Sequence, residues 1–421
     1  MTSRLPRLLQ GVHAGMPGDL GSHLEINGPL PDLGGVAPAH LIDEVERSGL
    51  RGRGGAAFPV ARKLQAVSSR RGPRIVLANG TEGEPASSKD RLLLSDLPHL
   101  VLDGIAVAAR AVGASDAVLA FPDDDDTIAD SLTAAIEDRR RAGITSDPNL
   151  ELFAVDDGFV TGNESALVNL VSGGEAKPTF GPRPFERGVR RRPTLVQNVE
   201  SLAHLAMIAR YGAGWFRELG TERDPGSALL TLSGAVAVPG VYEVEHGVPL
   251  ADLLDRAEAT EELTAVLIGG YFGSWLPARV ISRLRLSPAD LAPDGASLGA
   301  GVIVGFGTSA CPVAEITRVA DYLSSESAGQ CGPCVNGLDA IAQTLAEVAT
   351  GTAGPSAGRD LDRWTTSLAG RGACQLPDGA TRFVASGLRV FAEEFEDHRR
   401  HGRCDRCLAP AVLPVPLAGV R

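Results

Sequence analysis

The sequence predicts an α/β domain, then a small α+β module, then a C-terminal helical bundle. Strand and helix signals alternate over residues 41–225, as they do in α/β sheets. Short β segments separated by Gly and Pro follow over residues 226–310, and apolar residues repeat at helical spacing over residues 311–400. Residues 1–40 and 401–421 are expected to form an N-terminal arm and a cysteine-containing tail.

Composition and charge exclude several functional classes. The 421 residues include 40 Lys+Arg and 52 Asp+Glu, a net charge of -12 that disfavours nucleic-acid binding. The longest uncharged run, residues 295–314, is interrupted by glycines and Pro312, so no direct membrane insertion is expected. The N-terminus lacks the apolar core of a signal peptide, and six sparse cysteines suit a reducing compartment. We therefore expect a cytoplasmic protein, peripheral at most to a membrane complex.

The α/β elements are predicted in order from local patterns. Residues 1–40 are rich in Gly and Pro and predict a loosely structured arm. A helix around residues 39–48 then leads into a Gly-rich loop. Ile75–Leu77 and Ala117–Phe121 are typical of buried strands, and Val101–Val112 of the helix between them. Asp123–Asp126 place four carboxylates at the positive end of a further helix.

The elements after Pro225 are predicted from a change in the spacing of the apolar residues. After Pro225 the sequence predicts short β segments, one short helix, and strands at Ala265–Ile268 and Val302–Val304. Two amphipathic helices then follow, and each should bury one apolar face. The residues of these two faces are Ile316, Val319, Ala320 and Leu323, and Leu338, Ile341, Leu345 and Val348.

The Gly-rich loop Gly49–Pro59 is the first segment that suggests chemistry. Its glycines permit positive φ and let backbone N–H groups approach an anion, while Arg51, Arg53 and Lys63 add positive charge. A phosphate-bearing cofactor suits this loop. A flexible turn between helix and strand is an equal alternative.

Two polar segments follow predicted strands. The acidic stretch Asn79–Pro85 lies where an open α/β sheet exposes ligand-binding residues, although a solvated loop is the simpler interpretation. Residues 89–91, Lys-Asp-Arg, equally suit an ordinary surface ion-pair group. Asn163 and Ser165 have the side chains of helix N-caps, and Asn198 that of a turn former.

Taken together, these segments resemble the flavin- and NADH-binding (51 kDa, F-type) subunit of respiratory complex I and its relatives in NAD-dependent hydrogenases and formate dehydrogenases. The family loop G-L-R-G-R-G-G-A-G-F-P aligns with Gly49–Pro59, with Ala57 as the one change. N-A-D-E-x-E-P-G-x-x-K-D-R aligns with Asn79–Arg91, G-E-E-T-A-L with Gly162–Leu167, and P-T-x-V-N-N-V-E-T-L with Pro193–Leu202. The resemblance extends in the same order from about residue 44 to residue 404.

This resemblance implies a Rossmann-like FMN-binding domain over residues 41–225, with NADH stacked on the flavin. It also implies that residues 226–310 form an SLBB domain, a ubiquitin-like β-grasp unit. The flavin carries the hydride chemistry, so no catalytic side chain is required. The residues implied to contact FMN or the nucleotide are Gly52, Arg53, Gly54, Gly55, Phe58, Lys63, Asn79, Glu82, Glu84, Glu164, Gln197 and Asn198.

Two family carboxylates are replaced in this chain, by Thr81 and Asn163. Because a carboxylate near the adenosine ribose repels a 2′-phosphate, their loss leaves NADPH open as a substrate. The arginines at 190–192 suit the same interpretation. Weakened nucleotide binding is the alternative.

The family's [4Fe–4S] motif is incomplete. Cys331, Cys334 and Cys374 keep the family spacing, while Ala328 replaces the first ligand. We expect either a [4Fe–4S] cluster whose fourth iron is labile or has a replacement ligand, or a [3Fe–4S] cluster that lacks this iron. The alternative is no cluster, with the three cysteines packed as small apolar residues.

The remaining cysteines are interpreted separately. Cys311 follows a strand-like run with no evident partner and is expected to pack in the core. His398, His401, Cys404 and Cys407 offer four ligands for zinc, or one thiolate for the cluster. A solvated, basic tail is the favoured interpretation of this segment.

The sequence thus predicts an FMN-dependent NAD(P)H dehydrogenase subunit that passes electrons from NADH or NADPH to an iron–sulfur acceptor. Its expected partner is a separate iron–sulfur protein, a thioredoxin-like [2Fe–2S] subunit or a ferredoxin. The alternative is a non-enzymatic assembly or electron-relay subunit that kept the fold and lost nucleotide oxidation. Thr81, Asn163 and Ala328 favour this alternative.

Overall fold

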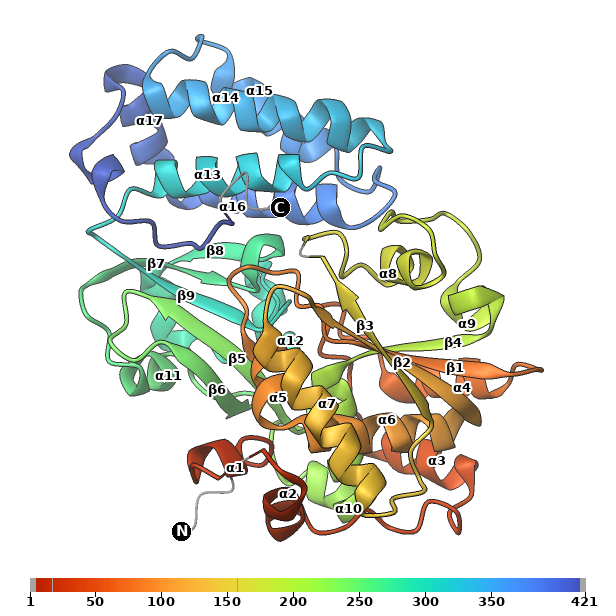
Figure 1. The fold of residues 1–421 in the computed structure, drawn as a ribbon. Helices are drawn as coiled ribbons and strands as arrows, with labels where there is room; N and C mark the ends of the chain where they lie inside the picture. Colours follow the sequence, from red (N-terminus) through yellow and green to blue (C-terminus); the bar gives the residue numbers. More distant parts are fainter. Residues whose placement is uncertain (1–4, 17, 157, 417–421) are drawn as a thin grey trace. The chain divides into compact units, whose positions relative to one another are not determined.

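The computed structural model describes residues 5–16, 18–156 and 158–416, which divide into two units (Figure 1). Unit 1 comprises the described residues up to Gly83 together with Ser88–Leu230 and Val241–Gly247. Unit 2 comprises Glu84–Ser87, Thr231–Gly240 and the described residues from Val248 onward. The chain therefore passes between the units five times, and neither unit is one continuous stretch.

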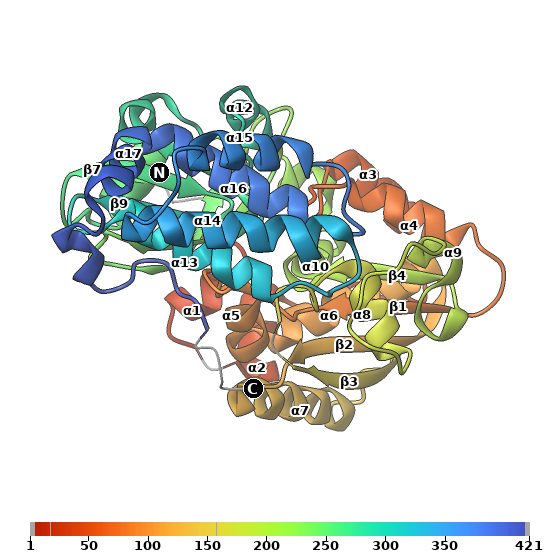
Figure 2. The same ribbon diagram turned by 90° about the horizontal axis from the view of Figure 1, so that it is seen from above.

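A four-stranded parallel sheet lies in unit 1, with strand order β3-β2-β1-β4 (Figure 2). Its strands are β1 (Arg74–Asn79), β2 (Ala114–Pro122), β3 (Asn149–Val155) and β4 (Thr194–Asn198). Successive side chains of a strand point to opposite faces, and each face of this sheet is apolar. Val76 and Leu119 join one core cluster, whereas Leu77 and Val118 join a second one.

Helices cover both faces of this sheet (Figure 1). The larger core cluster includes residues of α3, α4, α6 and α10, and the smaller one includes Leu167 and Val171 of α8. The helices of unit 1 are α1 (Gln10–His13), α2 (Leu20–Asn27), α3 (Pro38–Ser48), α4 (Val60–Ser68), α5 (Lys89–Asp96), α6 (Pro98–Val112), α7 (Asp126–Arg141), α8 (Glu164–Val171), α9 (Pro184–Arg187) and α10 (Val199–Phe216).

The predicted α/β elements are confirmed. The strands at Ile75–Leu77 and Ala117–Phe121 are the centres of β1 and β2, and the helix at Val101–Val112 is α6. Asp125 caps α7 because its side chain accepts a hydrogen bond from the backbone N–H of Thr127. The chain thus has a mixed α/β fold with a parallel sheet and covering helices.

The expected loose arm over residues 1–40 is wrong for the described part of that segment, which contains α1, α2 and the start of α3. Leu8 and Leu9 are buried in the larger core cluster. Asp19 caps α2 by accepting from the backbone N–H of Ser22 at 3.0 Å. Long-range packing and one cap stabilise these short helices, and neither is visible in their local Gly- and Pro-rich composition.

A second, mixed sheet has strand order β6-β5-β9-β7-β8. β5 pairs with β9 in parallel, while β7 is antiparallel to both β8 and β9. Its strands are β5 (Ser227–Gly234), β6 (Gly240–Glu245), β7 (Leu263–Ile268), β8 (Ser274–Pro277) and β9 (Val302–Gly307), and the helices that follow β6 are α11 (Leu250–Arg256) and α12 (Pro288–Leu291).

Five helices lie in the C-terminal part of unit 2, among the described residues. They are α13 (Pro312–Ser325), α14 (Asp339–Thr350), α15 (Ala357–Ser367), α16 (Leu376–Val390) and α17 (Ala392–His401). α13 packs against α14 and α16, and the two predicted apolar faces are buried. Within the described ranges no single helix meets the length and hydropathy of a membrane span, although α5 and α6, bent by 97°, meet them as a pair.

Candidate functional site

The parallel sheet of unit 1 changes direction at β1. The chain goes from β1 outward to β2 and β3, and then returns to add β4 on the other side of β1. Open α/β sheets bind ligands beyond the carboxyl ends of the strands at such a switch point. Asn79 ends β1 and Asn198 ends β4, and the two residues are direct neighbours in the strand register. Two of the predicted cofactor residues therefore flank the switch point.

Hydrogen bonds orient both asparagine side chains. The Oδ1 of Asn198 accepts from the backbone N–H of Glu200 at 3.1 Å and so caps α10, while its Nδ2 donates to Asp90 at 2.6 Å. The Nδ2 of Asn79 donates to the carbonyl of Gly162 at 3.0 Å. Asn198 is thus an N-cap that also hydrogen-bonds Asp90, rather than a turn former alone.

The Gly-rich loop packs against this end of the sheet. A Cβ added to Gly54 would lie 3.2 Å from the Cβ of Asn198, so the loop approaches β4 at a distance that favours glycine. The backbone N–H of Arg53 donates to the Oγ of Ser201 at 2.8 Å. Positive φ occurs at Gly55 (104°) and at Ala57 (48°). Alanine replaces the family's glycine at this left-handed position, at a cost of about 1 kcal/mol.

A lysine and a glutamine complete the donors near these strands. The Nζ of Lys63 lies 3.0 Å from a carboxylate oxygen of Glu164 and 3.2 Å from the carbonyl of Val196. Gln197 is 3% exposed, and within the described residues its Nε2 has no hydrogen-bond partner. An unsatisfied buried amide is costly, so a ligand acceptor is the expected partner. Glycines, a cation and amide donors together fit a phosphate-bearing flavin.

Two of the predicted glutamates have structural partners. The carboxylate of Glu82 accepts from the backbone N–H groups of Asp90 at 3.0 Å and Arg91 at 2.8 Å, which belong to the first turn of α5. Glu84 belongs to unit 2, where its carboxylate accepts from the backbone N–H of Tyr271 at 2.8 Å. Both carboxylates therefore stabilise the chain.

A buried ion-pair network lies behind the loop. The Nζ of Lys89 is 2.7 Å from Asp90 and 3.0 Å from Glu200, and the Nε of Arg53 is 3.7 Å from Glu200. Burial raises the pKa of Glu200, but Lys89, His204 and Arg53 outweigh it and lower the pKa to about 2. Three neighbouring groups thus keep this carboxylate ionised.

The suggestion that residues 89–91 form a surface ion-pair group is wrong for the first two. Lys89 and Asp90 are 3% and 5% exposed, whereas Arg91 pairs with Asp124 at the surface. Sequence reasoning missed Glu200, which joins Lys89, because it lies more than a hundred residues away along the chain. Local sequence carries no signal of that contact.

Asn163 is confirmed as an N-cap. Its Oδ1 accepts from the backbone N–H groups of Ser165 and Ala166 at 3.0 and 3.3 Å, at the start of α8. Phe58 is 47% exposed, so its ring is accessible for stacking.

The three motif cysteines lie close together in unit 2. Cys334 lies in a short π-helix (Pro333–Leu338) with Cys331 just before it, and Cys374 precedes α16. Burial raises the pKa of Cys334 to about 12; the Ser327 hydroxyl opposes this shift, and Cys331 and Cys374 add to it. Burial also raises the pKa of Cys331, but the backbone N–H groups at 373 and 334 lower it overall. Three adjacent thiols fit three ligands of an iron–sulfur cluster.

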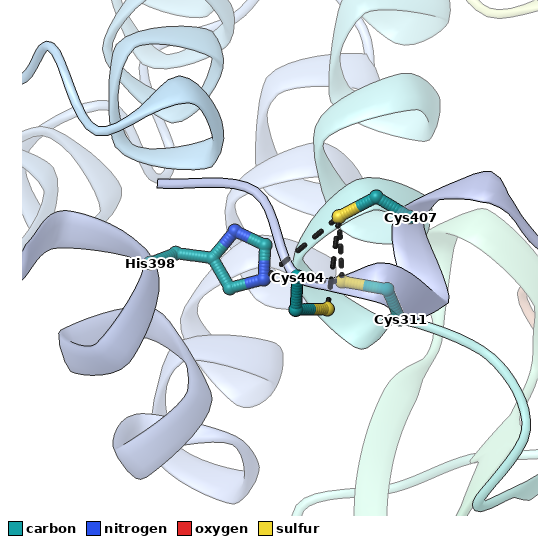
Figure 3. A group of neighbouring side chains, drawn as sticks. All are labelled: Cys311, His398, Cys404 and Cys407. Atoms are coloured by element: carbon teal, nitrogen blue, oxygen red, sulfur yellow. Dashed lines mark hydrogen bonds between the residues drawn. The ribbon is translucent and has the colours of Figure 1, made fainter. Parts of the chain in front are cut away.

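A second cysteine group contains three of the four ligands offered for zinc by the tail, with Cys311 in place of His401. Cys311, His398, Cys404 and Cys407 place one ligand atom each within 4.8 Å of one another (Figure 3). The expectation that Cys311 has no partner is therefore wrong. The solvated tail is also wrong for His398, which is 3% exposed, whereas His401 is exposed and lies outside the group.

Ionisation differs within this second group. Burial raises the pKa of Cys311 to about 12. Burial also opposes ionisation of Cys404, but hydrogen bonds from His398, Cys311 and Cys407 outweigh it and lower the pKa of Cys404 to about 6.

Comparisons with known proteins agree with this geometry. The family model of the Nuo51 FMN-binding domain matches residues 45–207, and that of the NADH-ubiquinone oxidoreductase-F iron-sulfur binding region matches residues 314–398. The first range contains the switch point and the Gly-rich loop. The second contains the three motif cysteines.

Curated relatives and solved structures cover most of the chain. The second F-type subunit of NADH-quinone oxidoreductase in Rhizobium meliloti is 31% identical over 88% of this chain and 91% of its own length. The corresponding F-type protein of Streptomyces coelicolor is 33% identical over 86% of this chain and 84% of its own. A crystal structure of NAD+-reducing [NiFe]-hydrogenase in the H2-reduced state matches 94% of this chain and 68% of that chain, with a TM-score of 0.85 and 31% identity. The chain therefore belongs to the family of flavin- and NADH-binding F-type subunits of respiratory complex I and NAD-dependent hydrogenases.

Proposed function

We propose that this chain is an FMN-dependent NADH dehydrogenase subunit that passes electrons to an iron–sulfur acceptor. The observation that carries the proposal is the switch point between β1 and β4. There the Gly-rich loop contacts Asn198, and the buried amide of Gln197 has no partner among the described residues. The match of the FMN-binding family model to these segments supports the same assignment.

The chain's own residues bind and orient the cofactor. The backbone N–H groups of Gly54 and Gly55 and the cation of Lys63 would hold the phosphate. The N–H of Gly52 instead donates to the carbonyl of Phe58 at 2.8 Å and so shapes the loop. Asn79, Gln197 and Asn198 would line the flavin, and Phe58 would supply an apolar face for the nucleotide. Arg53, Glu82 and Glu164 position the loop, the start of α5 and Lys63. An FMN held by these residues would supply hydride acceptance from NADH and release of the electrons one at a time.

The arginines near β4 support NADH over NADPH. Arg190 donates to both carboxylate oxygens of Glu151 at 2.8 and 2.9 Å, and Arg192 donates to Asp116 at 2.7 Å. Their charges are already balanced by carboxylates, which leaves less attraction for a 2′-phosphate.

Cys331, Cys334 and Cys374 hold an iron–sulfur cluster in this proposal, and the acceptor is an iron–sulfur protein. We propose that this partner is a separate thioredoxin-like [2Fe–2S] subunit or a ferredoxin. The match of the iron-sulfur family model over residues 314–398 supports the cluster.

The predicted domain organisation is part of the proposal. Residues 1–40 are the N-terminal segment, 41–225 the FMN and NADH domain, 226–310 an SLBB β-grasp domain, 311–400 a helical bundle and 401–421 the tail. A mixed sheet with the short helix α11 between β6 and β7 supports the β-grasp assignment. A cytoplasmic location, peripheral to a membrane complex, is proposed from the composition.

Flavin content and reduction by nucleotide test the proposed function. Protein purified anaerobically should be yellow, and NADH should bleach its flavin absorbance faster than NADPH does. Colourless protein that neither binds added FMN nor oxidises NADH would contradict the proposal and favour the non-enzymatic relay.

Restoring the missing ligand should change the cluster. With Ala328 in place of a thiolate, we expect the fourth iron to exchange with solution, so that oxidation gives a three-iron centre. Ala328→Cys should retain all four irons under the same oxidation, measured by iron analysis and EPR. Ala328→Val is the matched control, because it adds side-chain volume without a ligand atom, and it should behave as wild type. Absence of iron from both wild type and Ala328→Cys after anaerobic reconstitution would exclude the cluster.

A further inference from the structure

The group formed by Cys311, His398, Cys404 and Cys407 is independent of the motif cysteines and of the flavin site (Figure 3). Cys311 lies just before α13, His398 lies in the last turn of α17, and Cys404 and Cys407 lie at the start and near the end of one short turn. Four soft or borderline ligand atoms thus come from three separate places in the chain. We infer that these four side chains bind one structural Zn²⁺ ion.

The distances match a tetrahedral zinc site. Bonds of about 2.3 Å to sulfur and about 2.0 Å to nitrogen set S···S separations of about 3.8 Å and S···N separations of about 3.5 Å. The Sγ of Cys407 lies 3.8 Å from that of Cys404 and 3.5 Å from that of Cys311. The Nε2 of His398 lies 3.4 Å from the Sγ of Cys311 and 3.9 Å from that of Cys407. One central ion accounts for all four values.

A disulfide or an iron–sulfur cluster fits this group less well than zinc does. A disulfide needs an S–S distance of about 2.05 Å. The separations of 3.5 and 3.8 Å found here are much longer, and all three cysteines are free thiols. In a [4Fe–4S] cluster each thiolate binds a different iron, and in a [2Fe–2S] cluster each iron takes only two protein ligands, so four protein ligand atoms cannot all lie in contact around either cluster. Three thiolates and one imidazole in a tetrahedron are typical of Zn²⁺.

Groups around the site support the same assignment. The Nδ1 of His398 lies 3.2 Å from the carbonyl of Ala349, and a proton on Nδ1 that bonds this carbonyl leaves Nε2 free to bind metal. Three thiolates on one divalent ion leave a net charge of −1. Arg406 lies next to Cys407 and donates to the carbonyl of Ala310 at 3.5 Å, beside Cys311, where its charge offsets that excess.

The backbone between His398 and Cys404 makes a sharp turn that brings the two side chains together. Gly402 has a φ of 77°, and its N–H donates to the carbonyl of His398 at 2.8 Å, so the chain leaves α17 sharply toward Cys404. After Cys407 the tail docks again, because Leu413 is buried and its N–H donates to Glu315 at 2.8 Å. The zinc ion therefore anchors the first part of a tail whose later part packs on the same unit.

Metal analysis of the full-length protein tests the inference. Protein purified under reducing conditions without chelator should hold about one zinc per chain, and Cys407→Ser should lower zinc occupancy after dialysis at least about tenfold. Cys374→Ser is the matched control, because it removes a thiol of the iron–sulfur motif and should lower iron while zinc stays. FMN content should be the same in both variants, which separates this result from failure of the proposed function.

A spectroscopic measurement covers the case in which Cys407→Ser fails to fold. Co²⁺ exchanged into the wild type should give the intense visible bands of tetrahedral thiolate coordination, and added Zn²⁺ should remove them. Wild type that takes up neither Zn²⁺ nor Co²⁺ after reduction would overturn the inference. A Cys404–Cys407 disulfide in protein kept reduced, or zinc lost equally in Cys374→Ser, would overturn it as well.

Discussion

Gly54→Val should lose FMN while the protein stays folded. The first added atom would lie 3.2 Å from the Cβ of Asn198, and the two further methyl groups would enter the space between loop and strand. Overpacking of this kind costs about 1–3 kcal/mol, which corresponds to roughly a 10–100-fold loss of FMN affinity. Flavin absorbance of the purified variant, with titration of added FMN, measures the effect. The reason is steric, because positive φ in this loop occurs at Gly49, Gly55 and Ala57 and not at Gly54.

Gly214→Val is the matched control for this experiment. Gly214 lies in the same unit, has ordinary φ, and an added Cβ there would meet nothing within 4 Å. It should therefore keep full flavin and a circular dichroism spectrum like that of wild type. Full flavin occupancy in folded Gly54→Val would defeat the assignment of the loop.

Asp103→Asn should strongly destabilise unit 1. Asp103 is buried in α6, where its carboxylate lies 2.8 Å from Arg139 and 2.8 Å from His23 and also pairs with Arg210. Removing this charge deprives the buried guanidinium groups of Arg139 and Arg210 of a shared carboxylate. We expect this loss to lower the free energy of unfolding by about 3 kcal/mol. The thermal unfolding midpoint should fall by about 6–12 °C.

Asp147→Asn provides the control, and pH provides a second test. Asp147 also pairs with Arg139, at 2.7 Å, but is partly exposed, so its loss should lower the midpoint by less than about 3 °C. Burial raises the pKa of Asp103, but its hydrogen bond from His23 and the charges of Arg139 and Arg210 outweigh it and lower the pKa overall. The stabilisation is thus present above about pH 4, where an unfolded aspartate ionises, and is lost as pH falls below it. The difference in thermal unfolding midpoint between wild type and Asp103→Asn should therefore become smaller as the pH falls below about 4. A difference that stays constant down to about pH 3 would contradict this account.

Local patterns predicted the elements that carry the flavin site, but not how these elements meet. The apolar run at 75–77 identifies β1, and the motif around Asn198 marks the end of β4. The adjacency of the two strands depends on a pairing across more than a hundred residues. The resemblance to a family identified the residues of the flavin site. The order of the strands in the sheet explains why these residues lie together at the switch point between β1 and β4.

The wrong predictions share one physical cause. Lys89 and Asp90 are charged residues in a polar stretch. Their burial is tolerable because they pair with each other and because distant Glu200 and Asn198 contact them. Cys311 is separated from His398 by 87 positions, so no spacing rule connects them. In each case a long-range contact determines the environment of a residue, whereas its neighbours in the sequence suggest a different environment.

The repeated passage of the chain between the units limits how the gene can be divided. A fragment ending near residue 225 would lack Val241–Gly247, which belongs to unit 1. Within that segment, Glu243 accepts hydrogen bonds from the backbone N–H groups of Arg7 and Leu8 at 2.7 and 2.8 Å. Those two donors would lose their acceptor in the fragment. Recombination or gene fission at that boundary is therefore expected to destabilise unit 1, which favours keeping the two units on one polypeptide.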